Sequence, residues 1–289
     1  MWKSIDSWLN PMLTPVVVAL NAVANALGRW LLAPVAALPG WLSATIVGAV
    51  TGVLLLLMFK YTSRQKSIKK VRDDIKANLL ALKLFKESAV VALKAQGGIL
   101  IGAFWLFVFA LVPMIVMMVP VLLFLGQLAL WYQKQPLHVG EEAVVTLKIN
   151  GDKDAAWPKI ALEPTNALDV DIGPVKVVSE REVCWNIKAK EKGLHHLVFQ
   201  VGDEKVDKEL AVGDGFMRVS EQRPGWAWFD VLTNPWEKPF SSDSQIESIK
   251  IVYPERSSWV DGTDTWVIYW FIVSFVAAIL FRKVFNVNV

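Results

Sequence analysis

The sequence predicts an α-helical membrane protein that also carries a separate all-β domain. Hydrophobic residues make up 54% of the 289 positions and the mean hydropathy is +0.40, above the roughly 45–50% apolar content of soluble domains. Three stretches, 30–59, 95–133 and 265–281, contain no charged residue. Crossing a hydrocarbon core takes about 20 apolar residues, so the first two exceed this length and the third falls just short of it. Alternating apolar and polar residues after position 140 indicate β-strands.

Charge divides the chain into two parts of opposite sign. Ten Lys/Arg and three acids lie between Lys60 and Lys94, whereas sixteen Lys/Arg and twenty-three acids lie between Lys134 and Asp264. Cytoplasmic loops of membrane proteins carry an excess of Lys and Arg. We therefore expect a multi-pass protein of the cell inner (plasma) membrane, with the basic segment and the C-terminus in the cytoplasm and the β domain on the extracytoplasmic side.

Residues 1–40 are predicted to form an N-terminal interfacial region. Thr14-Pro15 has the pattern of an N-cap followed by proline at the first helical position, which predicts a helix over 15–30. Polar residues at a spacing of four form one stripe on this helix beside an apolar face, which favours a helix lying in the membrane interface. A full span is the alternative. The stripe comprises Asn21, Asn25 and Arg29.

Residues 41–60 are the first predicted transmembrane helix, and residues 61–97 form a basic cytoplasmic helical arm. Apolar residues repeat in the arm at intervals of seven and four, as in a coiled coil. Lys86-Glu87-Ser88 is a predicted turn, with Ser88 capping a second arm over 89–96. The basic residues either form a solvated face or contact a protein partner, anionic lipid or RNA. The apolar set is Ile68, Ile75, Leu79, Leu82, Ala89 and Leu93, and the basic set is Arg64, Lys66, Lys69, Lys70, Arg72 and Lys76.

Two further transmembrane helices are predicted, a long one over 98–133 and a last one over 265–283. Pro113 and Pro120 remove backbone donors and are expected to kink the first of these. Trp and Tyr favour membrane interfaces, which predicts seven interface anchors: Trp41, Trp131, Tyr132, Trp259, Trp266, Tyr269 and Trp270. The predicted polar residues within the membrane are Ser43, Thr45, Thr51 and Gln127.

Residues 134–264 are predicted to fold as an immunoglobulin-like β-sandwich. Alternation over 143–149, 183–189, 194–201 and 206–212 indicates strands, and 246–253 adds one more. Asn150-Gly151, Glu191-Lys192-Gly193 and Gly202-Asp203-Glu204 are predicted turns, the last two within hairpins. The only cysteine, Cys184, cannot form an internal disulfide, and Trp185 beside it is expected to face the core. The Trp- and Pro-rich stretch 213–245 is expected to be irregular and to rest on the bilayer surface.

The sequence contains no pattern typical of a catalytic, cofactor or metal site. His195 and His196 are neighbours on a predicted strand, so their side chains point to opposite faces and cannot share a metal ion. No glycine-rich phosphate loop is present. Ion pathways normally require a charge within a span, and the predicted spans have none. We therefore expect neither an enzyme nor a pump, with no cofactor and no DNA partner.

Residues 28–125 resemble the first half of the YidC/Oxa-type membrane protein insertase superfamily, especially the reduced branch that includes the core subunit of the ER membrane protein complex. The resemblance is carried by Leu38, Pro39 and Trp41, by a span with Thr45, Thr51 and 54–57, and by the basic stretch TSRQKSIKKV at 62–71. In that family a span leads into a cytoplasmic helical hairpin and then back into the membrane. The family also has a hydrophilic groove in the bilayer, whereas the spans here offer only hydroxyl and amide groups.

The resemblance implies a non-enzymatic scaffold or assembly factor for other membrane proteins. The alternative is a structural subunit of a larger membrane complex that uses the β domain as its interaction module. Both interpretations imply other membrane proteins as partners, most simply within a hetero-oligomeric complex.

Overall fold

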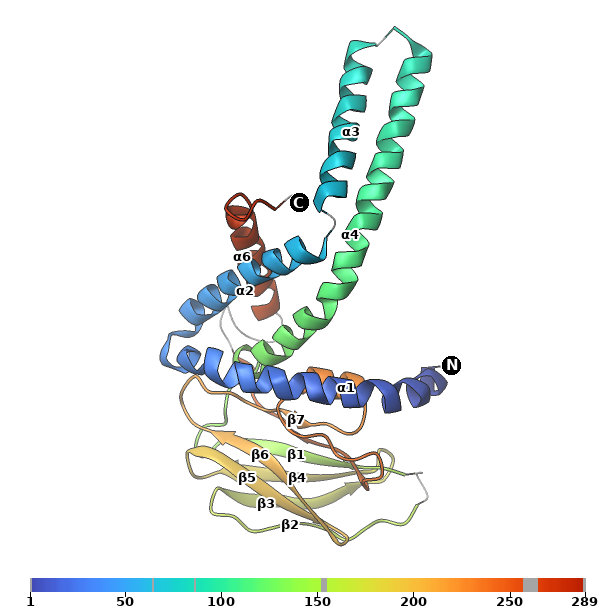
Figure 1. Cartoon of the computed structure of the whole chain (residues 1–289). Coiled ribbons are helices and arrows are strands. Elements are labelled where there is room, and N and C mark those ends of the chain that lie inside the picture. The colour runs from blue at the N-terminus through green and yellow to red at the C-terminus, as the bar shows by residue number, and fades with distance from the viewer. Residues whose placement is uncertain (1, 64, 86, 152–154, 257–264, 288–289) are drawn as a thin grey trace. The chain divides into compact units, whose positions relative to one another are not determined.

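The computed structural model describes residues 2–63, 65–85, 87–151, 155–256 and 265–287. It divides into two compact units that each contain segments distant in sequence. One unit comprises Met1–Ala44 and Leu122–Tyr269, and the other comprises Thr45–Val121 and Trp270–Val289. The predicted combination of a helical part with a β domain is confirmed (Figure 1).

The first unit consists of N-terminal helices, the last turns of a long helix and the β domain. Helix α1 and the 3-10 helix η1 come first, the end of α4 leads into the sheets, and α5 lies between the last two strands. The bounds are α1 Trp2–Leu31, η1 Ala33–Ala37, α4 Ala89–Tyr132, β1 Glu142–Ile149, β2 Ile160–Leu162, β3 Leu168–Val177, β4 Glu182–Ala189, β5 Gly193–Val201, β6 Glu204–Val212, β7 Gln222–Arg223, α5 Trp228–Thr233 and β8 Ile246–Ile251.

The β domain contains a five-stranded sheet, in the order β3-β4-β1-β8-β7, and a three-stranded sheet, in the order β2-β5-β6. All the strand pairs within these sheets are antiparallel. Strand β1 is central because its neighbours β4 and β8 pair with its two edges, and alternate residues of β1 are buried. One apolar core draws on β1, β4 and β8 of the larger sheet and on β5 and β6 of the smaller. Trp185 is 2% exposed and its ring lies 5.4 Å from that of Phe199, which confirms its predicted place in the core.

Two details of the β prediction were wrong. Gly202-Asp203 does join the β5–β6 hairpin, in which Val201 pairs with Glu204. The segment 190–192, however, connects β4 of one sheet to β5 of the other, so it is a crossover between sheets and not a hairpin turn. The stretch 213–245 is also not wholly irregular, because it contains β7 and α5. A local turn signal cannot tell whether the next strand pairs with the last one or crosses to a second sheet.

The second unit contains α2 (Gly40–Thr62) from Thr45 onward, α3 (Gln65–Leu84), α4 up to Val121, and most of α6 (Trp266–Phe281). Helices α2 and α6 pack closely because Gly48 and Gly52 have no side chains. A Cβ atom at Gly48 would contact Val273, and one at Gly52 would overlap the backbone of Ser274. Gly48 lies near the carbonyl of Trp270 and Gly52 near Ser274, and further along both helices Phe59 and Arg282 line one groove. The two helices therefore run parallel.

Helix α3 and the start of α4 form an antiparallel helical hairpin. Ile75 and Val71 lie against Gly102, and Asn78 lies against Gly98. The predicted turn falls between the two helices, since α3 ends at Leu84 and α4 begins at Ala89. Lys86 of that turn lies outside the described residues. The carbonyl of Ser88 accepts the first helical hydrogen bond from Ala92, as expected of an N-cap residue. The predicted second arm and the following span are one continuous helix of 44 residues that runs through Pro113 and Pro120.

Among the residues that the structure describes, three helices are long and apolar enough to cross a membrane: Leu9–Leu31, Gly40–Thr62 and Ala89–Tyr132. The last two contain predicted spans, whereas the predicted span over 265–283 is a shorter apolar helix of 16 residues. Helix α1 was expected to begin after Thr14 but begins at Trp2 and includes both Pro11 and Pro15. Thr14 is fully buried within the helix, so it is not the N-cap.

Candidate functional site

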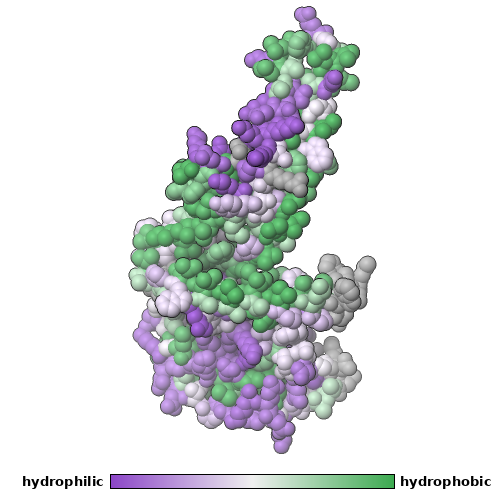
Figure 2. All heavy atoms as spheres, in the orientation of Figure 1, coloured by the Kyte–Doolittle hydropathy of each residue, from purple (hydrophilic) through white to green (hydrophobic). Residues whose placement is uncertain are grey.

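The basic arm presents most of its charge to solvent. Lys66, Lys69, Lys70 and Lys76 are exposed and Arg72 is partly buried, while Arg64 lies outside the described residues. Lys76 pairs loosely with Asp73, at 3.9 Å between Nζ and Oδ1. The opposite face of α3 packs on α4 through Ile68, which is 6% exposed, and through Ile75. Figure 2 shows hydrophilic residues gathered along α3.

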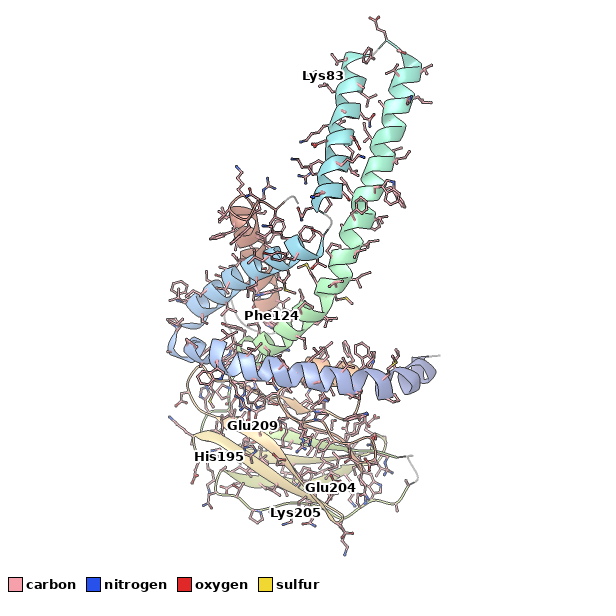
Figure 3. The ribbon with its side chains drawn as sticks, viewed as in Figure 1. Lys83, Phe124, His195, Glu204, Lys205 and Glu209 are labelled. Atoms are coloured by element: carbon pink, nitrogen blue, oxygen red, sulfur yellow. The ribbon has the colours of Figure 1, made fainter. Side chains whose placement is uncertain are left out.

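The end of the helical hairpin is apolar and exposed. The sequence pattern placed Leu79 and Leu93 in a packed stripe, but their exposures are 52% and 75%. They belong to a cluster in which every side chain is more than half exposed, which we call the hairpin tip: Leu79, Leu80, Leu84, Phe85, Val90 and Leu93. Lys83 lies among them near the end of the hairpin (Figure 3). A contiguous apolar patch of this kind usually marks an interaction site.

Each of the four predicted intramembrane polar residues has a partner within the protein. Ser43 donates to the carbonyl of Gly40 and accepts a hydrogen bond from the Tyr132 hydroxyl at 3.1 Å. Thr51 accepts from the Trp270 indole at 2.9 Å, and the Gln127 amide donates to the Asn25 side chain at 2.6 Å. Thr45 also has a partner. Ser43, Thr51 and Gln127 therefore each make a hydrogen bond to another helix.

The predicted interface anchors differ in exposure. Trp41 is exposed, as an interface role requires, and Tyr269 is partly buried. Tyr132, Trp266 and Trp270 are at most 7% exposed, and Tyr132 stacks on Trp266 at 6.5 Å between ring centroids. Trp131 is partly buried and stacks on Phe216. Trp259 lies outside the described residues.

The polar stripe of α1 contacts α5 and the chain that follows it. The Asn21 amide donates to the carbonyl of Val231 at 2.6 Å, and the Asn25 amide donates to that of Pro235 at 2.8 Å. The Arg29 guanidinium lies 5.0 Å from the centre of the Trp236 ring. Helix α1 thus lies along one end of the β domain (Figure 1). Its exposed face is apolar and includes Met12, Val16, Leu20, Val23, Leu27 and Trp30.

A buried charge network joins β6 to the stretch around Trp236, and sequence reasoning did not find it. Lys208 is 0% exposed and its ammonium donates to Glu237 at 2.6 Å and to the carbonyl of Ser220 at 2.7 Å. The next residue, Glu209 on β6 (Figure 3), accepts from Arg218 at 2.9 Å and from the Trp236 indole at 3.2 Å. Burial lowers the pKa of Lys208, and the Glu237 carboxylate opposes that shift. Alternation along β6 would place Lys208 inward, which was the one available signal.

A polar pocket of about 710 Å³ lies between α1, α5 and the edge of the larger sheet. Asp230, Lys148 and Glu247 line it, and the last two form an ion pair at 2.9 Å. Burial, and then the charge of Glu247, raise the pKa of Asp230. Lys148 therefore pairs with Glu247, and Asp230 adds a second carboxyl group to the lining.

The remaining reactive side chains are separated from one another. His195 contacts the carbonyl of Glu191, whereas His196 contacts the carboxylate of Asp207. The Cys184 thiol lies 3.7 Å from the Thr146 hydroxyl. Within the described residues no three His, Cys, Asp or Glu side chains are grouped so that they could hold a metal ion.

Comparisons with protein-family models, curated proteins and solved structures return no match for this chain. The geometry alone therefore points to the helical hairpin as the candidate site.

Proposed function

We propose that this chain is a non-enzymatic, multi-pass inner-membrane protein of the YidC/Oxa-like type that acts as a scaffold or assembly factor for other membrane proteins. The observation that carries the proposal is the helical hairpin, which combines an exposed basic face on α3 with the exposed hairpin tip. Apolar segments of newly made membrane proteins are natural ligands for the tip, because contact between the two removes apolar surface from water.

Anionic lipid is the second proposed ligand of the arm. Each basic residue near an anionic membrane surface contributes about 1 kcal/mol to binding. Lys66, Lys69, Lys70 and Lys76 are all exposed, so together they could hold the arm against the surface while the tip contacts its partner.

The proposed topology places both basic helix ends in the cytoplasm. Helices α2 and α6 run parallel, and both have basic residues at their C-terminal ends. Lys60 lies in the last turn of α2, and Arg282-Lys283 follow α6. Parallel helices with basic residues at the same ends agree with the positive-inside bias. The arm begins directly after α2, so it shares that side, and the β domain belongs on the extracytoplasmic side.

In this arrangement α1 lies in the membrane interface on the extracytoplasmic side. Asn21 and Asn25 of its polar stripe donate hydrogen bonds to the β domain, and its exposed face is apolar. A helix with one face on a water-soluble domain and the other face apolar fits the interface better than the bilayer interior. The β domain is proposed to be immunoglobulin-like because its two antiparallel sheets share one core around Trp185.

Charge reversal tests the proposed role of the arm. Lys66→Glu, Lys69→Glu and Lys70→Glu combined should reduce both recovery of membrane-protein partners after crosslinking and insertion of those partners. The matched control reverses Lys188, Lys190 and Lys192, three exposed lysines of the β domain. If the arm variant binds and supports insertion as well as the unaltered protein does, the scaffold proposal fails. If only the control loses partners, the structural-subunit alternative with the β domain as its interaction module replaces it.

A further inference from the structure

A groove of about 470 Å³ lies beside the contact between α2 and α6. This volume is within the roughly 300–1,000 Å³ typical of ligand sites. The lining is almost wholly apolar and includes Leu55, Phe59, Phe271, Phe275 and Ala278. Gly52 lets the helices touch at Ser274, and most of the lining follows that contact along both helices.

The polar side chains that line the groove differ in whether they have a hydrogen-bond partner within the protein. The Trp270 indole donates to Thr51 and the Ser274 hydroxyl donates to the carbonyl of Phe271, so both are satisfied within the protein. Arg282 also lines the groove and is exposed. Its guanidinium makes no hydrogen bond or ion pair with any residue that the structure describes. One end of an apolar groove therefore carries a positive charge that none of the described residues neutralises.

The position of Arg282 along α6 matches the depth of lipid headgroups. Helix α6 has 16 residues and so spans about 24 Å at 1.5 Å per residue, less than the ~30 Å of a hydrocarbon core. Arg282 follows its last residue, Phe281. If α6 crosses the bilayer, the guanidinium reaches the level at which phosphates lie, while Phe271 and Phe275 remain at the level of the acyl chains.

We propose that this groove binds an anionic glycerophospholipid, with one acyl chain between α2 and α6 and the phosphate on Arg282. The charge complementarity selects the ligand, because Arg binds phosphate through paired N–H donors and the rest of the lining offers only apolar contact. The proposal requires α2 and α6 to lie in a membrane. It does not depend on the scaffold role of the arm.

Native mass spectrometry of the full chain in mild detergent, titrated with phosphatidylglycerol or phosphatidylcholine, tests this site. The unaltered protein should retain one phosphatidylglycerol in preference to phosphatidylcholine. Loss of a charge-assisted phosphate contact predicts that Arg282→Gln weakens phosphatidylglycerol binding about tenfold. Lys283→Gln is the matched control, since Lys283 is the adjacent cation but does not line the groove, and it should change binding less than twofold.

A second variant tests the acyl chain separately from the headgroup. Ala278→Phe fills the groove and should reduce binding of both lipids, while helix content and the elution volume on gel filtration stay unchanged. Equal loss in Arg282→Gln and Lys283→Gln would show general attraction to basic residues and would overturn the site. So would equal affinity for the two lipids, no retained lipid, unchanged binding to a folded Ala278→Phe variant, or recovery of a polypeptide in place of the lipid.

Discussion

Lys208 shows how a single buried residue can hold the β domain to the chain around Trp236. Removal of one member of a buried ion pair leaves the other charge uncompensated and costs about 3–5 kcal/mol. We predict that Lys208→Met lowers the free energy of unfolding by this amount, because Glu237 is left without its cation. Chemical denaturation of the full chain in detergent measures the change.

Lys205 provides the control for Lys208 on the same strand. Its ammonium lies 2.6 Å from Glu163, but its side chain is 62% exposed, and exposed pairs contribute about 0–1 kcal/mol. Lys205→Met should therefore have little effect. The double variant Lys208→Met and Glu237→Gln should recover part of the loss, since neither buried charge remains. Equal effects of Lys208→Met and Lys205→Met would contradict the importance of the network.

Tyr253 makes stability depend on pH at the alkaline end. Its side chain is buried, its hydroxyl accepts a hydrogen bond from the amide of Ala211, and burial raises its pKa far above the ordinary value of 10.0. Above pH 10 the phenol ionises in the unfolded chain but stays protonated in the folded one, so folding stability should fall as pH rises. Below pH 10 this residue should contribute no pH dependence.

The denaturation midpoint between pH 8 and pH 11.5 tests the role of Tyr253. The unaltered protein should lose stability above pH 10, and Tyr253→Phe should show a smaller slope there. The variant should also be less stable at pH 8 by about 1–3 kcal/mol, because the Ala211 amide loses its acceptor. Identical slopes in the two proteins would assign the alkaline loss to other groups.

Residue-scale predictions from sequence succeeded where burial alone decides the role. Trp185 was placed in the core by alternation, and the structure confirms it. Lys208 could not be placed in the same way, because its partners Ser220 and Glu237 lie 12 and 29 residues further along the chain. The stripe formed by Asn21 and Asn25 was visible in the sequence, but the carbonyls that it contacts lie about 210 residues away.

At the scale of elements, the contact between α2 and α6 depends on Gly52. A Cβ atom there would overlap the backbone of Ser274, which cannot move without the helix, and overpacking of this kind costs about 1–3 kcal/mol. We predict that Gly52→Ala lowers the thermal midpoint of the protein in detergent. Gly97→Ala is the control, because nothing lies within 4 Å of a Cβ atom at Gly97. A Gly52→Ala midpoint equal to or above that of the control would contradict close packing of α2 and α6.

Element boundaries were predictable where the chain gives a local signal and not where it lacks one. The turn before Ser88 was found from local composition, and it separates α3 from α4. Strand β3 was missed because it is an edge strand that pairs with β4 alone and is exposed along most of its length, so alternation is lost. Gly173-Pro174 within it also reads as a break.

At the scale of the whole molecule, the charge distribution and the pattern of apolar residues together predicted the division into a helical part and a β domain. The uncharged stretches correspond to α2, most of α4 and α6, and the acidic stretch corresponds to the sheets. The sequence did not indicate that the helices themselves would be divided between two units, at Ala44, Val121 and Tyr269. That division depends on packing between residues far apart in sequence, such as Tyr132 with Ser43.

The proposed orientation, with the helical hairpin inside and the β domain outside, is tested most directly by thiol labelling. Lys83 near the end of the hairpin is exposed and His195 on β5 is partly exposed (Figure 3). Each is replaced by cysteine after Cys184→Ala removes the native thiol. In sealed spheroplasts a membrane-impermeant maleimide should label the His195→Cys protein at once and the Lys83→Cys protein only after lysis. Labelling of both proteins in sealed spheroplasts, or of neither, would contradict the topology.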